Sequence, residues 1–184
     1  MNKIVAIVGM CGSGKSVASD ILVEKGWKKV YFGGVTMEKL QEEGLEINPI
    51  NEKMMRERLR SELGMGAYAK ILLPRIKEYA SIGNTVLDGL YSWDELKILR
   101  EELGDALTVI AIVVDRKVRY SRLNNRDYRP LTNKEALDRD LAEIENIAKA
   151  GPIAHADYYI LNNSTKDEYS NRLEEILNSI EENL

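Results

Sequence analysis

The pattern of apolar and polar positions divides this chain into short buried strands and amphipathic helices. Apolar runs predict five strands, at residues 4–8, 29–32, 84–88, 107–114 and 156–161. Helical spacing of apolar residues predicts helices at 14–25, 35–43, 51–63, 67–79, 93–103, 116–126, 133–149 and from 165 almost to the end. Strands that alternate with helices predict an α/β fold, in which a parallel sheet with the first strand at its centre is covered on both faces.

Capping and breaking residues set the expected ends of several helices. Residues 45–50, which contain Pro49, are predicted to form a loop, and Asn51 is expected to cap the helix that follows. Asp115 and Thr165 are expected to cap the helices that they precede. The pair at 151–152, Gly-Pro, is expected to stop the helix that begins at 133.

The segment 9–16, with the sequence GMCGSGKS, joins the first strand to the first helix and matches the P-loop pattern G-x-x-x-x-G-K-S. Its glycines allow the backbone N–H groups to surround a polyphosphate at a helix N-terminus. We expect Lys15 to reach the β and γ phosphates of ATP and the Ser16 hydroxyl to bind Mg²⁺. The expected nucleotide-binding residues of this segment are Gly9, Gly12, Ser13, Gly14, Lys15, Ser16 and Val17.

Composition limits the class of protein. With 184 residues and 44% hydrophobic content, the chain is expected to form one domain, 1–184, as a monomer or weak homodimer. A net charge of −4 argues against a nucleic-acid partner. No apolar run approaches the roughly 20 residues of a membrane span, and no charged leader precedes the first strand, so a cytoplasmic protein without a membrane partner is expected. One cysteine and one histidine leave no internal disulfide and no zinc site.

Asp88 is the candidate carboxylate for Mg²⁺. It ends a short apolar strand and is followed by Gly89, and strands of open α/β sheets deliver ligand-binding groups at their carboxyl ends. The alternative is that Asp88 caps the next helix, although Ser92 or Asp94 can also fill that position.

A basic segment follows the fourth strand. Residues 116–129 contain six basic side chains and one acidic side chain. Arg119, Arg122 and Arg126 are spaced i, i+3, i+7, which predicts one helix face, and Pro130 predicts a loop at 127–132 that projects Arg129. A solvated charged face is the alternative, but the sequence nearby lacks acidic partners, which favours binding of the ATP phosphates. Arg122 and Arg126 are candidate catalytic residues, and Arg122 and Arg129 are candidate nucleotide ligands.

Arg56 and Arg60 are the candidate ligands for a phosphate group of the acceptor. They lie four positions apart on the predicted helix 51–63 and can pair with a phosphate, although a solvated helix face is equally consistent with this spacing.

Two segments of the second half, RLNNRD at 122–127 and ADYYILNN at 156–163, resemble dephospho-CoA kinase, in which the first opens the lid and the second lies by the adenine. The turn Leu87-Asp88-Gly89 resembles that of adenylate kinases and archaeal adenylate kinase-related proteins. Over its full length the chain is similar to the P-loop nucleoside monophosphate kinase-like superfamily. This resemblance implies a sheet order of 2-3-1-4-5, an acceptor-binding helical insertion at 35–79 and a lid at 119–139. It also implies Asn162 at the nucleotide, and Gly89 and Tyr91 at the acceptor.

The chain departs from both relatives. Dephospho-CoA kinases carry an aspartate after the second strand, where this chain reads YFGG at 31–34. Adenylate kinases carry an arginine shortly after the D-G turn, where this chain reads LYS at 90–92. We therefore expect a kinase that uses ATP and Mg²⁺ to phosphorylate a small nucleotide-like acceptor, with no general base identified. Two alternatives are a dephospho-CoA kinase-like enzyme and an ATP-binding regulator that has lost phosphoryl transfer. An ATPase motor is disfavoured because no second acid follows Asp88.

Overall fold

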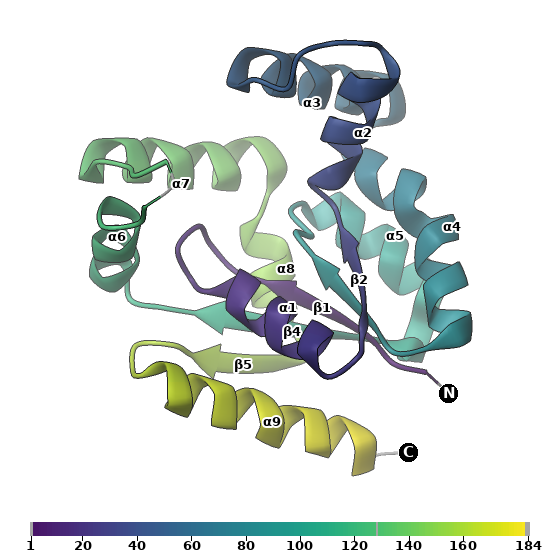
Figure 1. Ribbon diagram of the computed structural model, residues 1–184, viewed down its shortest axis with the longest axis vertical. Coiled ribbons are helices and arrows are strands. Elements are labelled where there is room, and N and C mark those ends of the chain that lie inside the picture. Colours follow the sequence, from purple (N-terminus) through teal and green to yellow (C-terminus); the bar gives the residue numbers. More distant parts are fainter. Residues whose placement is uncertain (1, 128, 183–184) are drawn as a thin grey trace.

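A five-stranded parallel sheet forms the middle layer of the computed structural model, which describes residues 2–127 and 129–182 (Figure 1). The strands are β1 (Ile4–Val8), β2 (Lys28–Tyr31), β3 (Thr85–Asp88), β4 (Leu107–Val113) and β5 (Tyr158–Leu161). Their order is β2-β3-β1-β4-β5, and all neighbours are parallel. The predicted α/β class, strand order and central β1 are confirmed.

Helices cover both faces of the sheet. They are α1 (Lys15–Glu24), α2 (Gly34–Glu42), α3 (Pro49–Leu63), α4 (Ala67–Ile82), α5 (Trp93–Leu103), α6 (Arg116–Asn124), α7 (Asn133–Ile147), α8 (Ala150–Ala154) and α9 (Lys166–Glu182), with a 3₁₀ turn at Gly104–Ala106. Residues of α1 and α9 pack on one face, and residues of α4, α5 and α8 pack on the other. Because both faces are buried, the central strands are almost entirely apolar.

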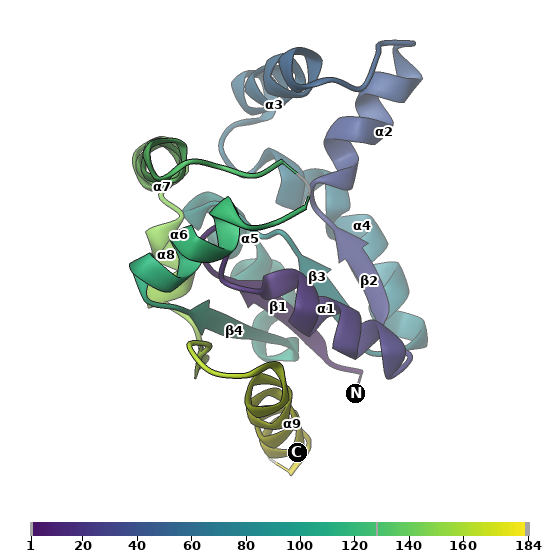
Figure 2. The ribbon, with the colours of Figure 1, turned by 60° about the vertical axis from the view of Figure 1, so that its left-hand side comes forward.

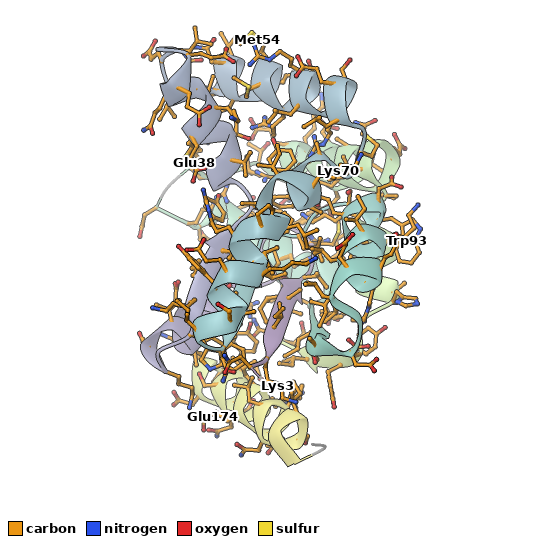
Figure 3. All side chains as sticks on the ribbon, turned by 90° about the vertical axis from the view of Figure 1, so that its right-hand side faces the viewer. Lys3, Glu38, Met54, Lys70, Trp93 and Glu174 are labelled. Atoms are coloured by element: carbon orange, nitrogen blue, oxygen red, sulfur yellow. The ribbon has the colours of Figure 1, made fainter. Side chains whose placement is uncertain are left out.

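The two sheet faces bury alternate residues of β1. Val5 and Ile7 join the core under α1 and α9, whereas Ile4, Ala6 and Val8 join the core under α4 and α5. At the start of this strand, Lys3 Nζ donates to the carbonyl of Ile180 in α9 at 2.8 Å (Figure 3). Both termini therefore lie at the end of the sheet opposite to the P-loop (Figure 1).

The region 35–79, predicted to bind the acceptor, comprises α2, α3 and most of α4. Helices α2 and α3 project beyond the sheet (Figures 1 and 2). Leu40 and Met55 are buried in the same core as β2 and α4, so this region is part of the domain. Thr36 and Tyr68 are joined by a buried hydroxyl–hydroxyl hydrogen bond of 2.7 Å. On α3, Met54 lies on the outer side, and 42% of its surface is exposed (Figure 3).

Two helix ends differ from prediction. Helix α3 begins at Pro49 because the Asn48 side chain accepts the Asn51 N–H at 2.9 Å, so Asn48 and not Asn51 is the cap. Proline fits here because the first helical residue needs no N–H partner. Helix α7 ends at Ile147, and the Gly-Pro pair at 151–152 lies inside α8 instead of stopping α7.

Of two further predicted helix caps, one is confirmed and the other makes no capping hydrogen bond. Thr165 accepts the Glu168 N–H at 3.3 Å and caps α9 as expected. Asp115 occupies the cap position of α6, but its side chain makes no capping hydrogen bond. Nowhere in the described stretches is there a helix with the length and apolar character to cross a bilayer.

Candidate nucleotide-binding site

The P-loop has the backbone conformation that glycine permits. Gly12 and Gly14 have φ angles of 80° and 93°, in the left-handed region that residues with a Cβ rarely adopt. A Cβ atom at Gly14 would also lie 2.7 Å from Asn162 Nδ2, and one at Gly12 would lie 3.0 Å from Leu123 Cγ. Both spacing and conformation therefore require glycine at these two positions.

Side chains from three other elements hold the carbonyl groups of the P-loop. Asn162 Nδ2 donates to the Ser13 carbonyl at 2.9 Å, and Tyr169 Oη of α9 donates to the Gly14 carbonyl at 3.0 Å. Arg119 Nη1 of α6 donates to the Cys11 carbonyl at 3.0 Å. Since the C=O and N–H of a trans peptide point in opposite directions, holding the carbonyls this way turns the amide groups to the other side of the loop.

Asn162 was predicted to bind the nucleotide, and its amide is here committed to the P-loop. The side chain is almost fully buried, and its donated hydrogen bond joins the end of β5 to the loop. A direct contact with the nucleotide stays a prediction for this residue, whereas its contact with the loop is present.

Lys15 lies at the start of α1, and Nζ donates to the Met10 carbonyl at 2.9 Å. Burial lowers the pKa of its amine to about 8, and the positive charge of Lys149 contributes in the same direction. The Ser13 hydroxyl is buried and has no partner among the described residues. A partly buried cation that is costly to charge and a buried hydroxyl without a partner among the described residues both fit an anionic ligand, so the loop fits a polyphosphate.

Arg119 does not belong to a phosphate-binding face. It is buried and pairs with Asp140 of α7 through two hydrogen bonds, Nη1–Oδ1 at 3.0 Å and Nη2–Oδ2 at 2.6 Å. The sequence near Arg119 lacks an acidic partner, but Asp140 is distant in sequence and close in space. The hypothesis that Arg119 shares a phosphate-binding helix face with Arg122 and Arg126 is therefore wrong. Arg119 instead connects α6, α7 and the Cys11 carbonyl of the P-loop.

The other three arginines of this segment, Arg122, Arg126 and Arg129, do not lie together on one helix face. The helix ends at Asn124, so Arg126 lies in the following loop and not on the helix face that was predicted. Arg126 Nε donates to the Arg129 carbonyl at 2.6 Å, and Arg129 approaches Glu52 of α3 at 3.6 Å. Arg122 Nη1 is buried, without a partner in the part of the chain that the structure describes.

Arg122 also lies near the residues that hold the P-loop. Its positive charge acts on the Tyr169 hydroxyl, although burial dominates and raises the pKa of that tyrosine. A charged nitrogen that is buried without a partner is costly unless a ligand satisfies it.

Asp88 ends β3 and is mostly buried, with Oδ2 3.0 Å from Lys29 Nζ. Lys29 also lies 3.2 Å from Asp20 of α1, and although partial burial opposes it, the hydrogen bonds to these carboxylates raise the pKa of Lys29. Asp88 does not cap α5: Ser92 Oγ accepts the Glu95 N–H at 3.1 Å in a capping box. The capping alternative for Asp88 is therefore wrong, and its metal role stays a prediction. Residues 2–127 and 129–182 contain no cluster of three or more His, Cys, Asp or Glu side chains suited to a metal.

The arginines predicted for the acceptor have different surroundings. Arg60 lies over the ring of Tyr68, 5.4 Å from its centroid, and its buried Nε has no partner among the described residues. Arg56 is half-exposed and 3.5 Å from Glu52 of the same helix. The structure therefore gives Arg60 a partly enclosed setting and Arg56 the setting of an ordinary surface ion pair.

The sequence did not reveal a charged cluster at the end of α7. Glu143 accepts from Arg139 Nε at 3.2 Å and from Lys149 Nζ at 2.6 Å, and Lys149 is buried. Lys149 Nζ lies 5.0 Å from the ring centroid of Tyr91. The only sequence signal was the i, i+4 spacing of Arg139 and Glu143, which is also typical of surface helix pairs.

A shallow groove of about 430 Å³ lies between α6 and α7. Its lining consists of Arg116, Lys117, Tyr120, Asn133, Lys134 and Leu137. None of these residues belongs to the P-loop, so the groove is separate from the nucleotide site.

Residues 5–148 match the sequence profile of the family described as AAA domain. The chain is 35% identical to a UPF0200 protein of Sulfurisphaera tokodaii, which covers 97% of both chains. It is 32% identical to a UPF0200 protein of Thermococcus onnurineus, over 96% of this chain and 97% of the relative.

Two solved structures share the fold. The structure of TT1252 from Thermus thermophilus has 16% identity and a TM-score of 0.68, and covers 97% of each chain. Shikimate kinase from Bacteroides thetaiotaomicron has 14% identity and a TM-score of 0.62, and covers 96% of this chain and 98% of that one. At these identities they show a P-loop kinase-like fold, and the P-loop itself implies nucleotide binding.

The lowered pKa of Lys15 predicts a pH-dependent nucleotide affinity. A bound polyphosphate favours the charged amine, so above the free-protein pKa of about 8, binding takes up a proton. ATP affinity should then fall by up to about tenfold per pH unit between pH 8 and 10. Isothermal titration calorimetry in buffers of different ionisation enthalpy measures the proton uptake. In Lys15→Arg the guanidinium stays charged, so uptake in this range should disappear; equal uptake in both proteins would assign the proton to another group.

Proposed function

We propose a function on the premise that this chain belongs to the UPF0200 family and carries an AAA domain. The proposed function is that of an ATP-dependent kinase of a small nucleotide-like acceptor. The observation that most supports this proposal is a set of groups at or near the P-loop that are suited to bind an anion. Lys15 is partly buried with a lowered pKa, and Ser13 Oγ and Arg122 Nη1 are buried without partners among the described residues. Arg122 comes from the arginine-rich segment after β4, so both the loop and a lid would contact phosphate.

The P-loop would hold ATP through its backbone amides and Lys15. Magnesium normally keeps several waters and needs one or two protein oxygens besides the phosphates, and Ser16 and Asp88 would supply them. When bound, the metal neutralises phosphate charge during transfer. Asp88 must then exchange Lys29 for the metal, and Asp20, which already contacts Lys29, would retain that lysine.

The segment from α6 into α7 would act as the lid. Phosphoryl transfer needs alignment and charge stabilisation more than covalent chemistry, and arginines that approach the transferred group supply both. Arg126 and Arg129 lie in the loop of this segment, and Arg129 already approaches Glu52 of the acceptor region. Closure of this loop would bring the arginines to the phosphates and exclude water, which otherwise competes as acceptor.

The main alternative is an ATP-binding regulator without transfer. Two observations favour it: Leu90, Tyr91 and Ser92 follow Asp88-Gly89 where adenylate kinases carry an arginine, and Asp88 is neutralised by Lys29. Dephospho-CoA is a further possible acceptor of the kinase, on the resemblance of residues 122–127 and 156–163.

A coupled assay for ADP release distinguishes these possibilities. The purified protein is given ATP and Mg²⁺ with no acceptor, with each nucleoside and deoxynucleoside monophosphate, and with dephospho-CoA. The kinase proposal predicts ADP release that depends on one acceptor class and is abolished in Lys15→Ala, with the fold kept by circular dichroism, because Lys15 is a charge donor and not a core residue. ATP binding without acceptor-dependent turnover would support the regulator.

Replacing Asp88 by Asn should leave ATP binding intact and weaken the dependence on Mg²⁺, because the change removes charge and keeps shape. The measurement is activity, or ATP affinity by fluorescence titration, as a function of Mg²⁺ concentration. Asp20→Asn is the matched control, since it removes the other carboxylate of Lys29 at an exposed site. If the two variants respond to Mg²⁺ alike, Asp88 serves only as the partner of Lys29.

Arg126→Ala should lower kcat by about 10³-fold or more while changing the Kd of ATP little, because a lid arginine meets charge that is redistributed in the transition state. Arg126→Lys should restore only part of the rate, since the planar fork is lost. Arg116→Ala, on the α6–α7 groove, is the control. A near-normal kcat in Arg126→Ala would assign the basic segment to a solvated surface.

A further inference from the structure

The charged cluster at the end of α7 is not used by the nucleotide site described above. Glu143 holds Arg139 and Lys149 together, and the Lys149 side chain is 3% exposed. These three groups carry two positive charges and one negative charge. Buried charges are normally paired because removing an ion from water is costly, so this cluster has one cation in excess.

The excess charge lies close to the P-loop. Lys149 Nζ lies 5.0 Å from the ring centroid of Tyr91, three residues beyond the carboxyl end of β3. In the parallel sheet β3 is a neighbour of β1, and the P-loop follows the carboxyl end of β1. The cluster and the P-loop therefore lie at the same edge of the sheet.

The cluster also has free donors. Arg139 uses Nε for Glu143, and its two terminal amino groups have no hydrogen-bond partner in the described part of the chain. Its side chain is 48% exposed, so a solute can reach the cluster there. A planar guanidinium can give two parallel hydrogen bonds to a phosphate, which makes these amino groups suitable phosphate ligands.

Tyr91 connects this cluster with the turn after β3. It lies directly after the Asp88-Gly89-Leu90 segment, and Lys149 Nζ is 5.0 Å from its ring centroid. Burial raises the pKa of the Tyr91 hydroxyl, and the negative charges of Asp88 and Glu143 act in the same direction. The fold thus brings Arg139 of α7 and Lys149, between α7 and α8, to a turn where the sequence itself carries no arginine.

We infer that Lys149 and Arg139, positioned by Glu143, bind the phosphate group of the acceptor beside Tyr91. This inference rests on the proposed function in one respect, the identification of the anion as the acceptor. The anion site itself is expected whether the protein is a kinase or a regulator. The acceptor would then enter from the α7–α8 side of the P-loop, and Arg60 would contact another part of it.

The test uses inorganic phosphate as the probe on protein saturated with Mg²⁺ and a non-hydrolysable ATP analogue, so that the P-loop is filled. Titration calorimetry should show one phosphate site in the wild type. Lys149→Met and Arg139→Gln should weaken phosphate binding by about tenfold or more, Lys149→Arg should retain part of it, and the affinity for the analogue should stay within about twofold in all. Lys134→Met, which replaces an exposed lysine on the same helix as Arg139, is the control.

Three outcomes would overturn the inference: no phosphate binding in the loaded wild type, equal binding in wild type and Arg139→Gln, or loss of binding only in Arg60→Met. Arg139→Gln keeps the test valid if Lys149→Met unfolds, because Arg139 is half-exposed. Glu143→Gln should weaken phosphate binding less than Lys149→Met does, since Glu143 positions the cations and does not touch the anion. Failure of the kinase proposal would appear separately, as phosphate binding without acceptor-dependent ADP release.

Discussion

The conformation of the P-loop depends on hydrogen bonds that its carbonyl groups receive from outside the loop. Asn162, Tyr169 and Arg119 come from the end of β5, from α9 and from α6, and each donates to a different carbonyl. A glycine-rich loop has many accessible conformations, and its entropy opposes any single one. These donors select the conformation in which the amides face a polyphosphate, so anion binding is prepared by parts of the chain more than 100 residues away.

The parallel sheet makes this convergence possible. Its strand order places β1 between β3 and β4, so the P-loop, Asp88 and the start of the arginine segment all lie at one edge of the sheet. Helices α2 and α3 rise on one side of this edge and α6 and α7 on the other (Figure 2). Arg119 and Lys29 are held by carboxylates, whereas Arg122 keeps a buried nitrogen without a partner among the described residues. Arg139 uses only Nε for Glu143, so its terminal amino groups can also reach an anion. The first two cations hold the structure together, and the latter two are suited to a ligand.

Much of the fold could be predicted because its signals are local. The apolar runs identified all five strands, and the GMCGSGKS segment identified the loop between β1 and α1, since buried strands and phosphate-binding loops need particular residues at consecutive positions. Errors arose where a nearby alternative satisfied the same backbone group. Asn48 competed with Asn51 for the N-terminus of α3, and only the geometry of the chain decides between two good caps three residues apart.

The sequence by itself determined the α/β class, the P-loop and the identity of the residues that follow the strands, because each depends on a contiguous pattern. Only the tertiary structure decided how the charges are paired. Asp140 forms an ion pair with Arg119, 21 residues away in sequence, and Lys29 forms an ion pair with Asp88. Lys149, which lies between α7 and α8, reaches Tyr91 from a position 58 residues away in sequence. The physical reason is that an ion pair depends on distance and burial, which neighbouring strands and packed helices set between residues that the linear sequence keeps apart.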